Sequence, residues 1–460
     1  LIKLLVRCFF MGIFVGDCFV FMKIEKRYLS APLMAQFEVT NLCNHRCIHC
    51  YNLDSKIENR PIQKVSDKIV LGVAQRLIDS GIFSIVVTGG EPLIKKELTK
   101  KVIQLFVDNN IKVGFNSNLT LFDDDFIEFL KDKNIRVLTS CPSAIPTSFE
   151  KLVSVDNYFL FEKNIQKMFA EGLKFTVNMV ITKNNLTEVR TTAEKMKNLG
   201  CRCFSATPMF LNMDYPRFDL LLSKEDVLNV ITDLLWIEKT LEMEVDILES
   251  LPKCIFPEKI LFEEHIFLNR KCQAGRTVIG VSCNGDITPC STNSISYGNI
   301  LNEDIKVIWA KMSDWRSMQY IPQECQDCSW LNRCNAGCRI NSKTIYGKWN
   351  SKEVWSTNPI INQPPQEYTT IVLKPETLLQ VNPNYKCRKE DENIYVFYNE
   401  SDETFFMVNK TYRDFIQTFN DNEKFTFGDL RQRYNITDIK VFHNVILFLI
   451  QKGILNLLFN

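Results

Sequence analysis

Between residues 34 and 248 the chain repeats one pattern, in which a short apolar run is followed by a turn and then by a segment with apolar residues at helical spacing. The apolar runs predict strands at 34–40, 82–88, 111–116, 135–140, 174–181 and 201–207. The amphipathic segments predict helices at 66–80, 95–109, 123–133, 157–171, 187–199 and 224–240. Repeated strand–helix units of this length predict parallel strands joined by right-handed crossovers. The expected fold class is therefore α/β.

The pattern changes after residue 349. Residues 350–383 have little periodicity and several prolines, which predicts a linker. Two β-rich runs follow at 394–398 and 404–408, and helices are predicted at 409–419, 426–434 and 437–452 before a last strand at 454–458. Strands followed by three helices predict a small winged-helix α+β domain over 384–460.

The charge balance argues against nucleic acid or an anionic membrane as a partner. The 460 residues contain 55 Lys and Arg against 54 Asp and Glu, and residues 384–460 contain ten against eleven. A phosphate-binding surface needs an excess of positive charge that neither the chain nor this domain has. We therefore expect the winged helix to serve something other than DNA binding.

Three of the 17 cysteines stand at C-x3-C-x2-C spacing directly after the first predicted strand: Cys43, Cys47 and Cys50. Structural zinc and [4Fe–4S] clusters usually take four protein ligands. Three thiolates would leave one iron of a cluster free to bind something else. The alternatives are three incidental cysteines or three of four zinc ligands.

This cysteine motif, with His49 before its last cysteine, resembles the radical S-adenosylmethionine superfamily. The stretch from Gly89 to Pro92, which follows the second strand, resembles the family's GGEP motif. The resemblance implies an open (β/α)6 barrel over 34–248 and a [4Fe–4S] cluster whose fourth iron is chelated by the cosubstrate. It also implies cosubstrate-binding residues at the carboxyl ends of the strands: Gly89, Gly90, Glu91, Pro92, Asn116, Asn118 and Ser140. The asparagines and Ser140 are equally suited to capping turns.

A second group of cysteines resembles the SPASM domain, which we place at 272–349. Six cysteines have its spacing: Cys272, Cys290, Cys325, Cys328, Cys334 and Cys338. The resemblance implies two auxiliary clusters, one using the early pair with Cys338 and the other using Cys325, Cys328 and Cys334. The last SPASM cysteine is missing, because Ile360 follows Asn358–Pro359. The second auxiliary cluster therefore has a non-cysteine ligand, has an open iron, or is absent.

The remaining cysteines have no clear assignment. Cys283 either completes the first auxiliary cluster or is a strand thiol, and Cys141 is expected to be an ordinary buried thiol. Cys201, Cys203 and Cys254 match no ligand spacing, and Cys387 lies in the last predicted domain.

The hairpin of the last domain, followed by Met407–Thr411 and later by Lys452–Leu455, resembles the peptide-chaperone domain also known as the RiPP recognition element. That resemblance implies that a precursor's leader binds as an added β-strand. The apolar face of the helix at 438–452 would complete the groove: Val441, Val445, Ile446, Phe448 and Leu449.

Together these resemblances predict a radical enzyme that modifies a ribosomally made precursor peptide. A 5′-deoxyadenosyl radical would abstract hydrogen and lead to a thioether, another crosslink or an epimerised residue. An external flavodoxin-like or ferredoxin-like protein would donate electrons. The product and the oligomeric state stay open.

Two alternatives come from other classes. The first is a maturase of a folded protein such as an anaerobic sulfatase, but Ser291 stands where those relatives carry an Asp base. The second is an Fe–S regulator with a winged-helix output, which the intact GGEP stretch and the neutral last domain disfavour.

The first 21 residues are mostly apolar but contain Lys3, Arg7 and Asp17, which weakens both a signal peptide and a membrane anchor. Because the stretch that begins at Met22 looks like a natural protein N-terminus, we expect residues 1–21 to come from an overlong gene model. Export would expose the clusters to oxidants, so we expect a cytoplasmic protein without a membrane partner.

Overall fold

The computed structural model describes residues 29–52, 65–263, 265–362, 372–401, 403–436 and 439–458. The expected extension at 1–21 and residues 363–371 of the expected linker lie outside this part of the chain. The chain divides into two compact units. We call Ala31–Gln366 the barrel unit, and we call the part from Glu367 onward the C-terminal unit.

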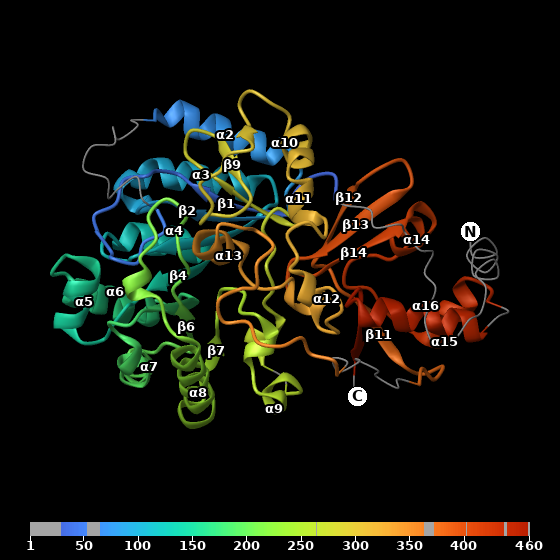
Figure 1. Ribbon diagram of the computed structural model, residues 1–460. Coiled ribbons are helices and arrows are strands. Elements are labelled where there is room, and N and C mark those ends of the chain that lie inside the picture. Colours follow the sequence, from blue (N-terminus) through green and yellow to red (C-terminus); the bar gives the residue numbers. More distant parts are fainter. Residues whose placement is uncertain are drawn as a thin grey trace. The chain divides into compact units, whose positions relative to one another are not determined.

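The barrel unit is built on a sheet with the strand order β10-β9-β8-β1-β2-β3-β4-β5-β6-β7 (Figure 1). Its central strands pair in parallel in sequence order, as predicted. They are β1 (Met34–Glu38), β2 (Ser84–Thr88), β3 (Lys112–Ser117), β4 (Arg136–Ser140), β5 (Phe175–Ile181) and β6 (Cys203–Pro208). The α/β class and the parallel sheet are therefore confirmed.

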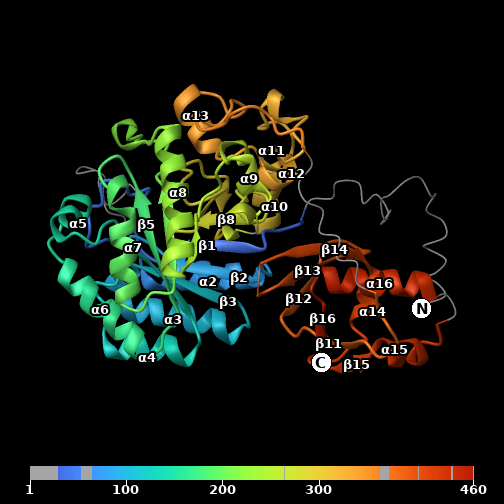
Figure 2. The same ribbon diagram turned by 90° about the horizontal axis from the view of Figure 1, so that it is seen from below.

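The predicted helices follow the strands and lie along the outer side of the sheet (Figure 2). They are α2 (Asp67–Asp79), α3 (Lys96–Asp108), α4 (Asp124–Asp132), α6 (Tyr158–Ala170), α7 (Val189–Asn198) and α8 (Lys224–Leu241). Side-chain caps define some of their starts, since Asp123 accepts from the Phe126 N–H and Ser223 forms a capping box with Asp226. Phe37 and Phe106 meet edge to face and are fully buried between sheet and helix.

Short elements that the sequence pattern did not predict extend this framework. β7 (Glu244–Asp246) continues the sheet beside β6, and β8 (Val278–Val281) pairs in parallel with β1. β9 (Asp286–Thr288) and β10 (Gly298–Asn299) add antiparallel pairs. The additional helices are α5 (Pro146–Val153), α9 (Glu258–Leu261), α10 (Ile305–Lys311), α11 (Ser313–Arg316), α12 (Leu331–Cys334) and α13 (Arg339–Tyr346). Elements of two to eight residues contain too few positions for a reliable period.

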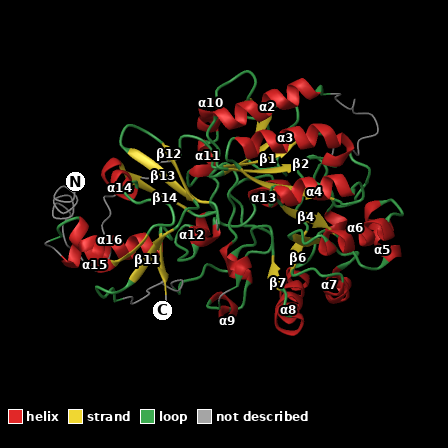
Figure 3. Ribbon diagram, turned by 180° about the vertical axis from the view of Figure 1, so that it is seen from behind, coloured by secondary structure: helices red, strands yellow, loops and turns green. Residues whose placement is uncertain are grey.

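The C-terminal unit contains two three-stranded antiparallel sheets and three helices (Figure 3). One sheet has the order β12 (Tyr385–Lys389), β13 (Ile394–Asn399) and β14 (Phe405–Asn409). The other has the order β15 (Lys424–Thr426), β11 (Leu378–Val381) and β16 (Leu455–Leu458). The helices are α14 (Lys410–Ile416), α15 (Phe427–Arg433) and α16 (Ile439–Gln451). The predicted hairpin, helices and last strand are present.

The boundary of this unit needs a correction. Strand β11 lies inside the range predicted as a linker, where it pairs with both β15 and β16. Its Leu379 is fully buried in the apolar core of the unit. The C-terminal unit therefore begins before residue 384. Proline-rich flanks and a length of four residues hid this strand from the sequence pattern.

None of the helices among the described residues combines the length and the apolar composition that crossing a bilayer requires.

The burial of β11 predicts that the C-terminal unit needs it for stability. In the fragment 367–460, Leu379→Ala should lower the free energy of unfolding by about 2–5 kcal/mol, because it leaves a cavity in the core. Val372→Ala is the control, since Val372 is 75% exposed and its truncation should change stability by less than about 0.5 kcal/mol. Urea unfolding followed by circular dichroism measures both. Equal stability of the two variants would show that β11 is not part of this core.

Candidate functional site

The loop that carries Cys43, Cys47 and Cys50 follows β1 and is held by backbone hydrogen bonds on two sides. On one side, the N–H groups of Arg46 and Ile48 donate to the carbonyl oxygens at the end of α5, at 2.9 Å each. On the other side, the N–H groups of the GGEP turn donate to the carbonyl oxygens of Thr40 and Leu42, at 2.7 Å each. The loop is thus fixed between the end of α5 and the GGEP turn, which are far apart in the sequence.

Two glycines make the second of these contacts possible. A Cβ atom on Gly89 would lie 2.4 Å from the carbonyl oxygen of Thr40, and one on Gly90 would lie 2.2 Å from that of Leu42. Both distances are far below van der Waals contact, and the obstructing atoms belong to backbone. These glycines are therefore needed for the close approach of the cysteine loop, whether or not they also touch a cosubstrate.

Glu91 connects this turn to the end of β3. Its side chain is fully buried, and one carboxylate oxygen accepts from the Leu93 N–H at 3.1 Å and from the Ser117 hydroxyl at 2.8 Å. The other oxygen accepts from the Asn118 N–H at 2.8 Å. Burial raises the pKa of Glu91 to about 7, and the three hydrogen bonds to its oxygens oppose that rise. Glu91 acts as a positioning residue in this structure.

The same network reaches the cysteine loop through two side-chain amides. The amide nitrogen of Asn118 donates to the side-chain oxygen of Asn44 at 2.8 Å, and Asn44 donates to the Thr120 hydroxyl at 2.8 Å. Asn116 is half-buried on β3, and Ser140 is exposed at the end of β4. The structure thus places all the predicted cosubstrate residues at the carboxyl edge of the sheet. Their contact with a cosubstrate stays a prediction.

The protein environment disfavours ionisation of the Cys43 thiol in the cysteine loop. Burial, with smaller contributions from the negative charges of Glu91 and Cys50, raises the pKa of Cys43 to about 11. The N–H of His45 donates to the Cys43 sulfur at 3.4 Å and opposes the rise. Iron bound at this loop would supply the missing positive charge, so the donor set fits an Fe–S cluster.

The structure also brings together the cysteines predicted for the first auxiliary cluster. Cys272, Cys290 and Cys338 come from three segments, and they raise one another's pKa because their negative charges repel. Burial is the largest cause of the raised pKa at each of them. The Cys290 sulfur lies 3.3 Å from the Thr292 hydroxyl. The three thiols are thus close enough to interact, and their binding of one cluster stays a prediction of the SPASM resemblance.

Sequence reasoning missed Glu249, which follows β7. Its negative charge raises the pKa of Tyr51, next to the cysteine loop, and of all three thiols of the first auxiliary site. Protein surrounds this carboxyl and raises its pKa to about 7, and Arg270 opposes the rise. The side chain still has accessible surface, so water moderates the effect. Glu249 thus lies close enough for its charge to act on both groups of residues.

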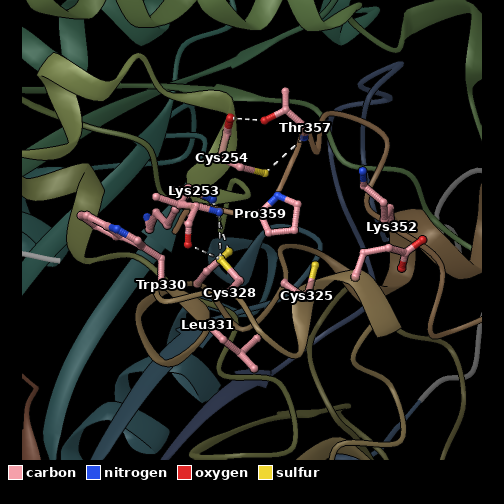
Figure 4. A pocket seen from close by; sticks show the side chains of 13 residues that line it. Lys253, Cys254, Cys325, Cys328, Trp330, Leu331, Lys352, Thr357 and Pro359 are labelled. Carbon is pink, nitrogen blue, oxygen red and sulfur yellow. Dashed lines mark hydrogen bonds between the residues drawn. The ribbon is translucent and has the colours of Figure 1, made fainter. Parts of the chain in front are cut away.

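The cysteines predicted for the second auxiliary cluster lie around one pocket (Figure 4). Cys325, Cys328 and Cys334 line it together with Cys254, which matched no ligand spacing in the sequence. The pocket has an empty volume of about 370 Å³, part of which is open to solvent. Cys254 lies more than 70 positions before the other three, and that separation explains why spacing did not reveal it.

The remaining described cysteines lie outside the spaced motifs. Cys283 is buried in the turn between β8 and β9, and its two alternatives, a ligand of the first auxiliary cluster or a strand thiol, stay predictions. Cys141 is fully buried, with its thiol 3.3 Å from the Ser143 carbonyl, which confirms an ordinary buried thiol. Cys387 is exposed on β12.

The described donors do not form a ready-made site for one metal ion. Across the described ranges, no three Cys, His, Asp or Glu side chains converge as closely as one metal ion requires. Zinc holds each sulfur at about 2.3 Å and draws four thiolates around one point. A cubane presents four separate irons and needs thiolates spread around a larger body.

Comparison with known proteins agrees with this geometry. Residues 37–196 match the model of the Radical SAM superfamily, and residues 272–329 match that of an iron-sulfur cluster-binding domain, SPASM. The chain is 27% identical over 285 residues to the antilisterial bacteriocin subtilosin biosynthesis protein AlbA of Bacillus subtilis, a match over 60% of this chain and 59% of that protein. It is 23% identical to PqqA peptide cyclase of Methylobacterium nodulans, over 78% of this chain and 94% of the cyclase.

Solved structures share the fold. SuiB of Streptococcus suis bound to its precursor peptide SuiA superposes with a TM-score of 0.58 at 17% identity, over 76% of this chain and 85% of SuiB. Native anSMEcpe with bound AdoMet superposes with a TM-score of 0.57 at 18% identity, over 70% of this chain and 94% of anSMEcpe. The chain therefore carries a radical SAM domain and a SPASM domain. Its cofactors are a [4Fe–4S] cluster with S-adenosylmethionine and auxiliary Fe–S clusters, which the thiol sites fit.

The close approach at the GGEP turn predicts a large effect of one methyl group. Gly90→Ala should destabilise the barrel unit by about 3 kcal/mol or more, because its Cβ meets backbone that cannot move alone. Gly114→Ala is the matched control, since its Cβ would have an ordinary 3.7 Å contact with Val86 and should change stability by less than about 1 kcal/mol. Urea unfolding and bound iron per chain, measured anaerobically, test this. Equal iron content and midpoints in both variants would contradict it.

Proposed function

We propose that this protein is a radical S-adenosylmethionine enzyme that modifies a ribosomally made precursor peptide. The observation that carries the proposal is the combination of a three-thiol loop at the carboxyl edge of the barrel sheet with a separate C-terminal unit of strands and three helices. The similar proteins AlbA and PqqA peptide cyclase, and the SuiB complex with a precursor peptide, support a peptide as the substrate class.

The bound cluster and cosubstrate would supply a 5′-deoxyadenosyl radical that abstracts a hydrogen atom from the peptide. The chain's own contribution is to hold and orient. Cys43, Cys47 and Cys50 would hold the cluster, and Glu91 would fix the GGEP turn against their loop. Cys272, Cys290 and Cys338 would hold the first auxiliary cluster. Three cysteines at that site leave an iron that a substrate group can bind.

The C-terminal unit would bind the leader, as the resemblance to the RiPP recognition element implies. One part of that prediction needs correction. Val445, Ile446 and Leu449 of α16 are packed in the core of the unit, so they do not line an open groove. Phe448 is partly buried and meets Phe406 edge to face. The side chain of Val441 lies outside the described residues.

Strand β14 offers a better surface for an added strand. It forms one end of its sheet, and β13 is its strand partner within the described part of the unit. The Asn399 N–H donates to the Thr404 carbonyl and the Lys410 N–H donates to the Asn393 carbonyl. In an antiparallel ladder, hydrogen-bonded and non-hydrogen-bonded residue pairs alternate. In this register Phe405 and Met407 belong to non-hydrogen-bonded pairs, so their backbone N–H and carbonyl groups point away from β13. A leader would bind these outward groups.

Two alternatives have less support. A maturase of folded proteins of the sulfatase type would have an acidic base after Cys290, and this chain has Ser291. An Fe–S regulator that binds DNA would need positive charge, and the last 77 residues are almost neutral.

A proline in β14 tests the function directly. Met407→Pro should remove an outward N–H without breaking a bond to β13, and a proline is tolerated at such edge positions. We expect leader-dependent modification of a full-length precursor to fall at least about tenfold, while 5′-deoxyadenosine formation without peptide persists. Mass spectrometry of the precursor and chromatography of 5′-deoxyadenosine measure the two.

Met407→Ala is the matched control, because it shortens the same side chain but keeps the N–H donor. The Cys43/Cys47/Cys50→Ala variant should make no 5′-deoxyadenosine. If Met407→Pro and a chain ending at Gln366 both modify the precursor as fast as the intact enzyme, the C-terminal unit does not recognise the leader.

A further inference from the structure

The second auxiliary site lacks the cysteine expected near position 360, yet four thiols surround its pocket. We propose that Cys254 is the fourth ligand of the second auxiliary cluster and replaces the missing downstream cysteine. The inference concerns cofactor binding by the SPASM domain and holds whatever peptide the enzyme modifies.

The pocket is closed by segments that are distant in the sequence. Cys254 lies in the 3-10 turn Lys253–Ile255, which leads from the barrel strands toward the cysteine-rich segment. Cys325, Cys328 and Cys334 come from the loop and short helix that follow α11. Figure 4 shows the thiols of Cys254, Cys325 and Cys328 directed toward the middle of the pocket. Four soft donors around one space are the set that Fe–S clusters use.

Backbone N–H groups donate to three of these four sulfurs. The donors are Lys253 to Cys334 at 3.3 Å, Thr357 to Cys254 at 3.2 Å and Ile360 to Cys328 at 3.4 Å. A neutral thiol is a weak acceptor, whereas a thiolate accepts strongly. N–H groups aimed at three sulfurs therefore suit the thiolate form that iron requires. Cys254 receives this bond as the expected ligands Cys328 and Cys334 do.

The segment around Ile360 lines the pocket, but it supplies no cysteine ligand. Pro359 and Ile360 line the pocket, and Ile360 bonds through its backbone to both Cys328 and Ser329. Its side chain cannot bind iron. The Thr357 hydroxyl donates to the carbonyl oxygen of Cys254, so this segment also fixes the turn that carries the replacement thiol. The replacement thiol thus lies beside the segment where the downstream cysteine is expected.

The proposal gives the two auxiliary sites different capacities. The first has three cysteines and leaves an iron for a substrate group or another ligand. The second would have all four irons bound by cysteine, so it would transfer electrons without binding substrate. It would also tie the exit of the barrel strands to the cysteine-rich segment through four bonds to iron.

The test uses the full chain with Cys43, Cys47 and Cys50 changed to Ala, which leaves only the auxiliary clusters. Adding Cys254→Ala should either remove about four irons and four sulfides per chain or, after mild oxidation, add about one spin per chain of [3Fe–4S] signal. Adding Ile360→Cys as well should return both readouts to those of the parent, because it restores a cysteine at the downstream position where the ligand is expected. Iron and sulfide analysis and electron paramagnetic resonance provide the measurements.

Cys201→Ala is the matched control, since Cys201 is a buried thiol outside the sites and should change neither readout. The proposal is overturned if Cys254→Ala equals the parent in iron, sulfide and spin. A second measurement avoids substitution at Cys254. In the unaltered protein, alkylation of Cys254 should be at least about tenfold slower with clusters than after their removal, and equal alkylation would also overturn the proposal.

Discussion

The structure depends on the contact between the cysteine loop and the GGEP turn. The N–H groups of Gly90 and Glu91 donate to the carbonyl oxygens of Thr40 and Leu42, at distances that admit no Cβ on either glycine. Glu91 then fixes the turn to the end of β3, because its fully buried carboxylate accepts hydrogen bonds from Ser117 and Asn118, and a third from Leu93 within the turn. The loop can present three thiols in a defined arrangement only because its backbone is held in this way. Preorganisation of this kind is what a radical reaction needs from its protein.

A second constraint is electrostatic. Burial and mutual repulsion raise the pKa of the clustered thiols, for instance to about 11 at Cys43 and Cys325 and to about 12 at Cys290. Sites of this kind favour thiolates only when a cation is present, and iron provides it. The three sites then differ in how many protein ligands they offer. With the ligands proposed above, three thiolates at the cysteine loop would leave room for the cosubstrate, three at the first auxiliary site would leave room for another ligand, and four at the second would leave none.

The sequence predicted the parts that rest on local pattern. The six central strands and their helices were predicted within a few residues, because long apolar runs and amphipathic segments carry a clear period. The motif cysteines were found because their spacing is short. Strand β11 was missed because four residues between prolines carry no period. Cys254 and Glu249 were missed because the fold brings them to their sites from distant positions. The sequence pattern predicted that the apolar face of α16 lines a peptide-binding groove, but Val445, Ile446 and Leu449 are buried in the core of the C-terminal unit.

The central claim is that one chain builds three separate cluster sites with ten cysteines. The iron and sulfide content of the intact, anaerobically reconstituted protein tests it most directly, with Mössbauer spectroscopy to identify the cluster type. Three cubanes predict about twelve irons and twelve sulfides per chain, all in [4Fe–4S] form. A protein that saturates at about eight of each, with its spectrum fully accounted for by two clusters, would contradict the account.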